Sequence, residues 1–126
     1  MFKKYFTPQE ANKRLPLVKK IVGDILRKAR DLRELIKKSQ DQEKLPAECP
    51  VLQAEIEILI SELETLGCFY KDWNFDIGLV DFPAVIEGKQ VFLCWRSDED
   101  EVKWYHRFED GYPGRTLIPE SMLKDA

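Results

Sequence analysis

The chain has 126 residues, of which 44% are hydrophobic and 34% are charged. A chain of this length folds as one domain with a modest core, which excludes a large enzyme. No apolar run approaches the roughly 18 residues that a membrane span needs, and the hydrophobic content is too high for a disordered chain. The basic start of the chain lacks the apolar stretch of a secretory signal, so we expect a cytoplasmic protein that contacts no membrane.

The cysteines Cys49, Cys68 and Cys94 are odd in number and have no C-x-x-C spacing. This argues against a disulfide framework and against a structural zinc knuckle, so we expect reduced thiols. The chain contains no P-loop, dinucleotide glycine fingerprint, H-E-x-x-H or G-x-S-x-G motif. Their absence weakens an enzymatic interpretation without excluding it.

Charge is distributed unevenly. Residues 1–38 hold 12 basic and 4 acidic residues, a net charge of +8, whereas residues 39–126 carry a net charge of −11. Such a split is most simply balanced inside the fold or between subunits. The basic residues Lys13, Lys20, Arg27, Arg30 and Lys37 could follow nucleic-acid phosphates. Because they lack interleaved aromatics and the pI is about 5.3, nucleic-acid binding is disfavoured.

A first helix is predicted over residues 7–38. It begins with the capping box Thr7-Pro8-Gln9-Glu10, in which the Thr7 hydroxyl accepts from a first-turn amide and Glu10 reaches back. Apolar residues then recur in alternating steps of four and three, as in a heptad seam. They are Ala11, Leu15, Val18, Val22, Ile25, Ala29, Leu32 and Ile36. Pro16 removes an amide, so the helix either kinks there, which we favour, or restarts after a short first turn.

Residues 39–50 are polar and contain two prolines, which predicts a loop. A second helix is predicted over residues 51–66, ending at Gly67. Its seam has the same spacing and consists of Leu52, Ile56, Leu59, Leu63 and Leu66. The other faces carry glutamates and no basic residue. An acidic helix folded back on a basic one would explain both seams and the charge split, although each ion pair adds only about a few tenths of a kcal/mol.

From residue 69 onward the spacing between successive apolar residues falls towards two, as in a β-strand. This predicts a three-stranded antiparallel meander over residues 79–108. Glu87-Gly88 joins strands 79–86 and 91–96, and residues 97–100 lead to strand 102–108. Asp81 then opposes Cys94, and Leu93 opposes Trp104. The face expected to pack on the helices contains Val80, Phe82, Ala84, Val91, Leu93, Trp95, Val102, Trp104 and His106. The wetter face contains Asp81, Cys94, Arg96, Lys103, Tyr105 and Arg107.

Cys94 and His106 are candidates for a metal site or a nucleophile–base pair, because a thiolate and an imidazole serve in both. With a four-residue second turn they point to opposite faces, whereas a slip of one residue would bring Cys94, Trp104 and His106 to one face. A packed thiol and a core-edge histidine are the alternative interpretation. Asp81 is a candidate metal ligand or acid–base group, or one half of a cross-strand charge pair.

Residues 109–115 contain two glycines and Arg115, a combination that can bind a phosphate or carboxylate through backbone amides and a guanidinium. The same residues are typical of a sharp turn that leaves a sheet. The candidates for ligand binding are Tyr105, His106, Arg107 and Arg115.

Several segments spread along the chain resemble an uncharacterised bacterial family, domain of unknown function 2203. They are Tyr5-Phe6-Thr7-Pro8-Gln9-Glu10-Ala11-Asn12, Leu15-Pro16-Leu17-Val18, Gly78-Leu79-Val80-Asp81-Phe82-Pro83, Val91-Phe92-Leu93-Cys94-Trp95-Arg96, Trp104-Tyr105-His106 and Gly111-Tyr112-Pro113-Gly114-Arg115. The resemblance implies a small cytosolic bacterial protein. It implies no activity, cofactor or active site.

We therefore expect an α+β fold, a long antiparallel helical hairpin packed on a small three-stranded antiparallel meander, with a turn and tail over residues 109–126. The leading functional hypothesis is a non-catalytic interaction or scaffold module. It would form a homodimer through the helices or the sheet edge, weakened by a charge at Ile25 or Leu59, or bind another protein. The alternative is a small metal- or anion-dependent enzyme or ligand-binding protein with its site near Asp81, Cys94, His106 and Arg115.

Overall fold

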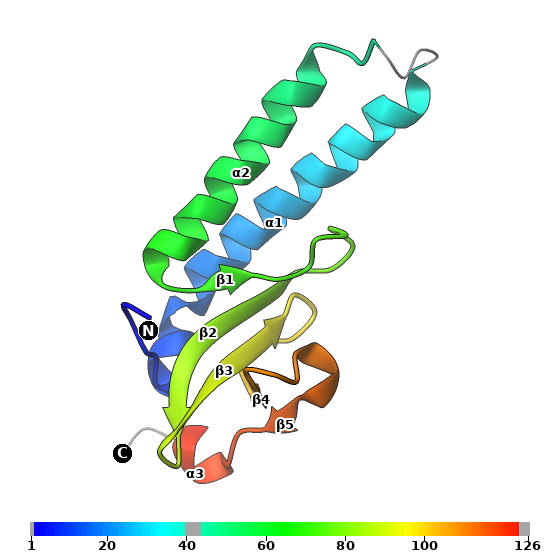
Figure 1. The fold of residues 1–126 in the computed structure, drawn as a ribbon. Coiled ribbons are helices and arrows are strands. Elements are labelled where there is room, and N and C mark those ends of the chain that lie inside the picture. Colours follow the sequence, from blue (N-terminus) through cyan, green and yellow to red (C-terminus); the bar gives the residue numbers. More distant parts are fainter. Residues whose placement is uncertain (1, 40–43, 124–126) are drawn as a thin grey trace.

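The computed structural model describes residues 2–39 and 44–123. Two long helices form an antiparallel hairpin, and a five-stranded antiparallel sheet packs across one end of it (Figure 1). The elements are α1 Pro8–Lys38, α2 Glu48–Leu66, β1 Phe69–Tyr70, β2 Leu79–Ile86, β3 Lys89–Arg96, β4 Trp104–Arg107, the 3₁₀ turn η1 Tyr112–Gly114, β5 Thr116–Leu117 and α3 Glu120–Leu123. The α+β class is confirmed, but the sheet has five strands where three were predicted.

Helix α1 begins at the predicted capping box. The Glu10 amide donates to Thr7 Oγ1 and the Thr7 amide donates to Glu10 Oε1, both over 3.1 Å. The helix continues through the exposed Pro16 to Lys38 without the restart that was one of the alternatives. The seam from Ala11 to Ala29 is buried, and its last two members are half-buried.

Helix α2 begins at Glu48, three residues before the predicted start. Pro50 therefore lies in its first turn, where backbone amides have no partner within the helix and a proline costs little. The helix ends at Gly67, whose φ of 97° gives the predicted left-handed cap. Residues 40–43 of the predicted loop and residues 124–126 of the predicted tail lie outside the described residues.

The sheet order is β1-β2-β3-β4-β5. Strands β2 and β3 pair as predicted, with Asp81 opposite Cys94 and a two-residue turn at Glu87 and Gly88. Both turn residues have positive φ, 52° and 78°, as a type I′ turn requires. The unpredicted strands β1 and β5 contain two residues each, too few to show a period of two.

The predicted pairing of the third long strand is wrong by one residue, because Cys94, not Leu93, lies opposite Trp104. The cause is a contact with α1. The Asn12 side chain accepts from the Val102 amide over 2.7 Å and donates to its carbonyl over 3.2 Å. Val102 therefore bonds to α1 instead of β3, and the strand begins only at Trp104.

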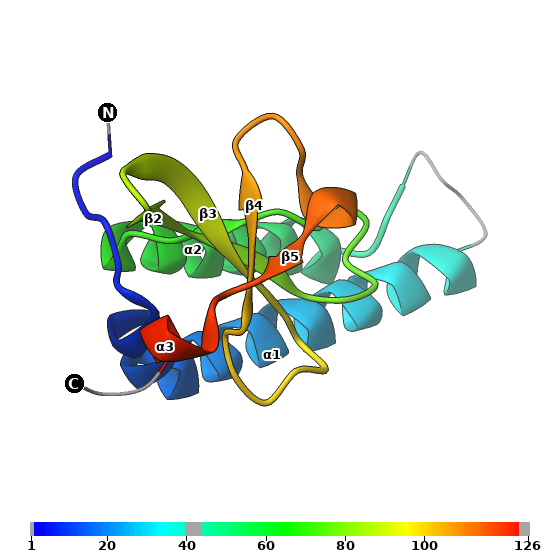
Figure 2. The ribbon, with the colours of Figure 1, turned by 90° about the horizontal axis from the view of Figure 1, so that it is seen from below.

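This slip exchanges the two faces of β4. Trp104 and His106, predicted to face the helices, lie on the outer face with Asp81 and Cys94, and Tyr105 packs against the core instead. The rest of the predicted apolar face, from Val80 to Val102, is buried against the hairpin. Helix α3 lies beside the first turns of α1, where Gln9 Nε2 donates to the Met122 carbonyl over 2.6 Å (Figure 2). No helix among the described residues has the length and apolarity to cross a bilayer.

Candidate functional site

Three side chains with metal-ligating atoms meet on the sheet face that points away from the helices. Asp81 comes from β2, Cys94 from β3 and His106 from β4. Adjacent strands bring them together, because Asp81 lies opposite Cys94 and His106 lies opposite Phe92, two residues before that cysteine. All three are almost fully buried, with exposed fractions of 4%, 1% and 4%. Their ligating atoms lie within 4.8 Å of one another.

The orientation of the His106 ring is fixed by hydrogen bonds at both nitrogens. Nδ1 lies 2.7 Å from the Arg107 carbonyl oxygen, which can only accept, so Nδ1 carries a proton. Nε2 lies 3.2 Å from each oxygen of the Asp81 carboxylate. An ionised carboxylate also only accepts, so a proton on Nε2 completes an imidazolium–carboxylate pair.

The pKa of His106 reflects a balance of opposing effects. Burial alone would lower this pKa, because the charged ring loses its hydration. The hydrogen bonds to Asp81 and to the Arg107 carbonyl outweigh burial, and the net pKa lies above its ordinary value. A neighbouring ammonium, that of Lys71, opposes the rise. The folded protein therefore holds the proton of the ring more tightly than an unfolded chain would.

The Cys94 thiol has the opposite tendency. Burial, followed by the negative charge of Asp81, raises its pKa to about 12, and Arg115 only partly offsets this. The thiol is consequently protonated at neutral pH and is a poor nucleophile by itself. A cysteine nucleophile activated by His106 is thus disfavoured by the surroundings of both groups.

A pocket of about 270 Å³ opens onto the three residues. Its other lining residues are Lys71, Leu79, Phe92, Phe108, Gly111 and Tyr112. The Lys71 ammonium lies 5.3 Å from the centre of the Phe92 ring. Phe2, near the start of the chain, packs at this place too, with ring centres 5.5 Å from Phe92 and 5.8 Å from Phe108. The pocket is thus lined by aromatic rings, by one ammonium group and by the polar side chains of Asp81, Cys94 and His106.

Arg115, a predicted ligand-binding residue, is close to Cys94 but is engaged elsewhere. Its Nη1 lies 2.9 Å from a carboxylate oxygen of Glu99, and both side chains are largely buried. The guanidinium also lies over the rings of Trp104 and Tyr112, at 4.8 and 4.5 Å from their centres. Glu99 balances its charge, so Arg115 supports the wall of the pocket and is not among its lining residues.

The other two predicted ligand-binding residues lie outside the pocket. Tyr105 packs towards the helices as a consequence of the register of β4. The exposed Arg107 side chain pairs with Asp110, Nε to Oδ2, over 2.7 Å. Of the six candidates, the structure brings together Asp81, Cys94 and His106 around one pocket.

Sequence reasoning missed most of the pocket wall. Phe92 could have been found, since it lies two residues before Cys94 on the same strand and therefore on the same face. Lys71 lies outside the predicted strands, in a segment whose course the local sequence does not indicate. Gly111 and Tyr112 belong to the turn over residues 109–115 that the sequence marked as a candidate for ligand binding, and both line the pocket. The loop that follows Lys71 is organised by Asp72, whose carboxylate accepts from the amides of Asn74, Asp76 and Ile77.

The three buried residues fit a transition-metal ion. Carboxylate oxygen, thiolate sulfur and imidazole nitrogen are the ligands that Zn²⁺ binds in proteins, with bonds of about 2.0–2.3 Å. Tetrahedral bonds of that length place ligand atoms roughly 3.5 Å apart. His106 and Asp81 already meet this spacing at 3.2 Å. No pair among the three exceeds 4.8 Å, so a closure of about 1 Å suffices for the widest.

Comparison with known protein families gives one result. The family described as uncharacterized conserved protein, DUF2203, matches residues 4–118. That range covers the helical hairpin, all five strands and the three buried residues of the cluster. Searches of curated proteins and of solved structures found no match.

Proposed function

The chain belongs to the DUF2203 family of uncharacterized conserved proteins, and we propose its function from the site itself. Asp81, Cys94 and His106 bind a divalent transition-metal ion of the Zn²⁺ class, with one coordination position open to the pocket. Structural zinc sites are closed by four protein ligands, whereas catalytic sites use three and leave a position for water or substrate. The proposed function is therefore metal-dependent chemistry on a small molecule.

One observation carries this proposal: three different ligating side chains, almost fully buried, converge from three strands to within 4.8 Å. A buried ion pair alone accounts for Asp81 and His106, but not for a thiol placed beside them. The hydrogen bond from His106 Nδ1 to the Arg107 carbonyl supports the same conclusion. Metal-binding histidines usually donate their second ring N–H in this way, which orients the other nitrogen towards the metal.

Metal binding would change the protonation of the cluster. Cys94 binds as a thiolate and His106 binds through Nε2, so both groups must release a proton. Because the pKa of the Cys94 thiol is about 12 in this surrounding, a bound cation is what would ionise it at neutral pH. Affinity for the metal should therefore rise with pH, with protons released on binding.

The pocket limits what the metal would act on. At about 270 Å³ it lies just below the range of roughly 300–1,000 Å³ that is usual for ligand pockets, which favours a small substrate. The Lys71 ammonium favours an anionic group on that substrate, and the rings of Phe92 and Phe108 favour an apolar part. We place this activity in the cytoplasm, where Cys94 would stay reduced and so remain able to bind the metal.

The test is titration of the metal-free protein with Co²⁺, which occupies zinc sites and gives a thiolate charge-transfer band in the near ultraviolet. We expect about one ion per chain and a band that Cys94→Ser and His106→Gln remove. Cys49→Ser is the matched control, because it removes another buried thiol, in the first turn of α2, and should leave the band unchanged. Thermal unfolding of each metal-free variant checks that it folds.

Two results would contradict the proposal. One is a wild-type protein that shows no thiolate band at stoichiometric Co²⁺ and no metal by elemental analysis after growth with zinc. The other is a band that persists in Cys94→Ser and disappears in Cys49→Ser. In either case Asp81 and His106 form a structural ion pair, and the interaction-module hypothesis regains the lead.

A further inference from the structure

The net charge of the pocket indicates which ligand it accepts. The two positive charges of a divalent ion would be balanced by the carboxylate of Asp81 and the thiolate of Cys94, with His106 neutral. Of the other lining residues, Lys71 alone is charged. Among the described residues no carboxylate pairs with its ammonium, which lies 5.3 Å from the centre of the Phe92 ring. The loaded pocket therefore carries one net positive charge and suits a ligand with one negative charge.

Two arginines flank the pocket but add nothing to this charge, because each is paired with a carboxylate. Arg115 pairs with Glu99 over 2.9 Å, and Arg96 pairs with Asp98 through its Nε. Neither arginine is among the lining residues. Within the described part of the chain, Lys71 is thus the lining cation that a ligand can neutralise.

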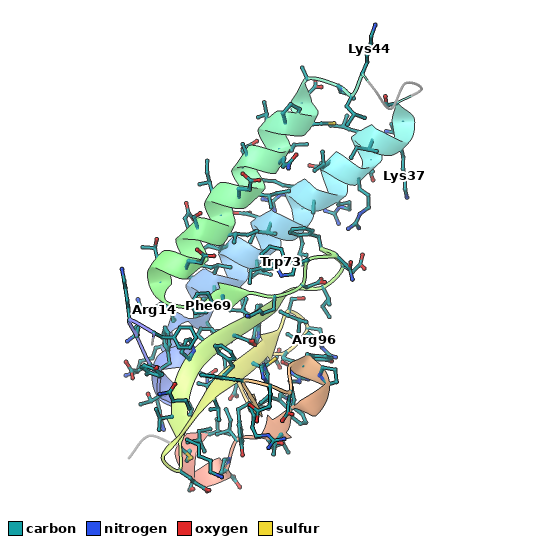
Figure 3. All side chains as sticks on the ribbon, in the orientation of Figure 1. Arg14, Lys37, Lys44, Phe69, Trp73 and Arg96 are labelled. Carbon is teal, nitrogen blue, oxygen red and sulfur yellow. The ribbon has the colours of Figure 1, made fainter. Side chains whose placement is uncertain are left out.

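The hydroxyl of Tyr112 is a second donor at the pocket. It accepts a hydrogen bond from Arg96 Nη1, since a guanidinium can only donate. Figure 3 shows Arg96 beside the 3₁₀ turn η1, which contains Tyr112. The proton of the hydroxyl meets no acceptor among the residues that the structure describes. Because Tyr112 lines the pocket, this proton is available to a ligand there, and the hydrogen bond from the cation strengthens its donation.

The ring of Tyr112 is held in place by the same two arginines. The Arg115 guanidinium lies 4.5 Å from the ring centre and that of Arg96 lies 5.7 Å from it. Their carboxylate partners fix both guanidinium groups in turn. A donor that is already oriented binds a ligand at a smaller cost in conformational entropy.

We propose that the substrate of the metal site is a small carboxylic acid with an apolar body. Its carboxylate is bound by the Lys71 ammonium and the Tyr112 hydroxyl, and its body lies against Phe92 and Phe108. This inference rests on the proposed metal site. A sphere of the pocket's volume is only about 8 Å across, so both donors can reach one carboxylate.

A carboxylate fits this subsite better than a phosphate does. It carries the single negative charge that the pocket lacks, and its oxygens accept hydrogen bonds from both donors. A phosphate monoester carries a charge of about −1.5 to −2 at pH 7, which would leave the occupied pocket negative. A neutral amide has the same planar shape but leaves the Lys71 charge unbalanced.

The test uses benzoate and benzamide, which share a ring and differ in charge. Isothermal titration calorimetry measures the affinity of each for the Co²⁺-loaded protein. We expect benzoate to bind about tenfold or more tightly than benzamide. Tyr112→Phe should weaken benzoate binding by about tenfold, because it removes a hydrogen bond to a charged group. Lys71→Met keeps most of the apolar stem and should abolish the preference for benzoate.

Tyr105→Phe is the matched control. It also removes a phenolic hydroxyl, but Tyr105 packs against the core and not into the pocket, so the affinity for benzoate should be unchanged. The Co²⁺–thiolate band of each variant shows that the protein is folded and that the metal site is intact. A lower affinity with an unchanged band therefore reports on the carboxylate subsite itself.

Three results would overturn this inference while the metal site stands. They are a Co²⁺-loaded wild type that does not bind benzoate, equal affinities for benzoate and benzamide, and an affinity for benzoate that Tyr112→Phe leaves unchanged. A wild type without the thiolate band overturns the proposed function and this inference together. The Co²⁺ titration thus distinguishes the two failures before any carboxylate is added.

Discussion

The helical hairpin and the outer face of the sheet place charge in opposite ways. On the hairpin, charged groups lie at the surface and one ion pair of the described residues joins the two helices. On the sheet, a carboxylate, an imidazole and a thiol are buried together. A charged group at the surface costs little free energy and can determine which partners bind. Burying a charged group costs much more free energy, so such groups occur where they are paired with one another or take part in function. The two regions therefore differ in kind: the hairpin keeps its charge in contact with water, whereas the outer face of the sheet withdraws three ionisable groups from it.

The largest expected effect is a difference in the free energy of unfolding between a buried and an exposed position on α1. Ile25 is fully buried in the core, whereas Leu17, on the same helix, is 45% exposed. We expect Ile25→Ala to lower the free energy of unfolding by about 2–5 kcal/mol, because it removes buried methyl groups and leaves a cavity. Leu17→Ala should cost under about 1 kcal/mol. Urea unfolding measures both, and equal losses would contradict the distinction between the two positions.

The next effect concerns the buried pair. Asp81→Asn keeps the shape of the side chain but removes the charge that stabilises the His106 imidazolium. We expect a loss of about 1–3 kcal/mol in the free energy of unfolding near pH 6. Asp98→Asn is the control, because Asp98 pairs with Arg96 at the surface, where water screens the interaction, and its loss should be much smaller. Comparable losses in the two variants would show that burial of the pair is not what matters.

The stability of the metal-free protein should depend on pH through His106. Its folded pKa lies above the ordinary value near 6.5, so the folded state holds the proton more tightly than the unfolded state. The stabilisation is therefore fully present below about pH 6.5 and is lost as the pH rises through the folded pKa. Asp81→Asn should flatten this dependence in urea unfolding from about pH 5 to 9. A wild type that gains stability over that range would contradict the sign.

A smaller effect connects the two regions. Asn12→Ala removes the two hydrogen bonds that hold Val102 to α1 and that determine where β4 begins. We expect a loss of about 1 kcal/mol in the free energy of unfolding, together with weaker binding of Co²⁺. Lys19→Ala is the control, because it removes an exposed hydrogen bond to the Asp100 carbonyl of the same loop. Binding that both variants leave unchanged would mean that the cluster does not depend on this contact.

The smallest effect is that of the Lys28–Glu55 pair on the hairpin, where both side chains are partly exposed. A double-mutant cycle with Lys28→Ala and Glu55→Ala should give a coupling of roughly 0.2–1 kcal/mol, reduced by salt. A coupling several times larger would show that charge, and not only the apolar seam, holds the two helices together.

The hairpin was largely predictable because its signals are local. The capping box at Thr7, the heptad seams and the cap at Gly67 each depend on residues within a few turns of one another.

The two positions at which the sequence predicted that a charge would weaken a dimer are poor choices for that test. Ile25 is buried and Leu59 packs against the core, so charges there would unfold the protein before they reported on a dimer.

The candidate site was only partly predictable, because its geometry depends on a distant contact. Asp81 and Cys94 could be paired from the turn at Glu87 alone. The position of His106 depends on Asn12, which is 90 residues away from Val102 in the chain and fixes the register of β4. A pattern of alternating residues fits both registers, and only the three-dimensional structure distinguishes them.

The place of Phe2 beside Phe92 and Phe108 has a practical consequence for the metal experiments. A polyhistidine purification tag fused ahead of Phe2 would emerge next to the pocket and bring competing imidazoles to it. Such a tag could bind Co²⁺ itself or donate a foreign ligand to the open position. Protein for these titrations should therefore be purified without any tag at its amino terminus.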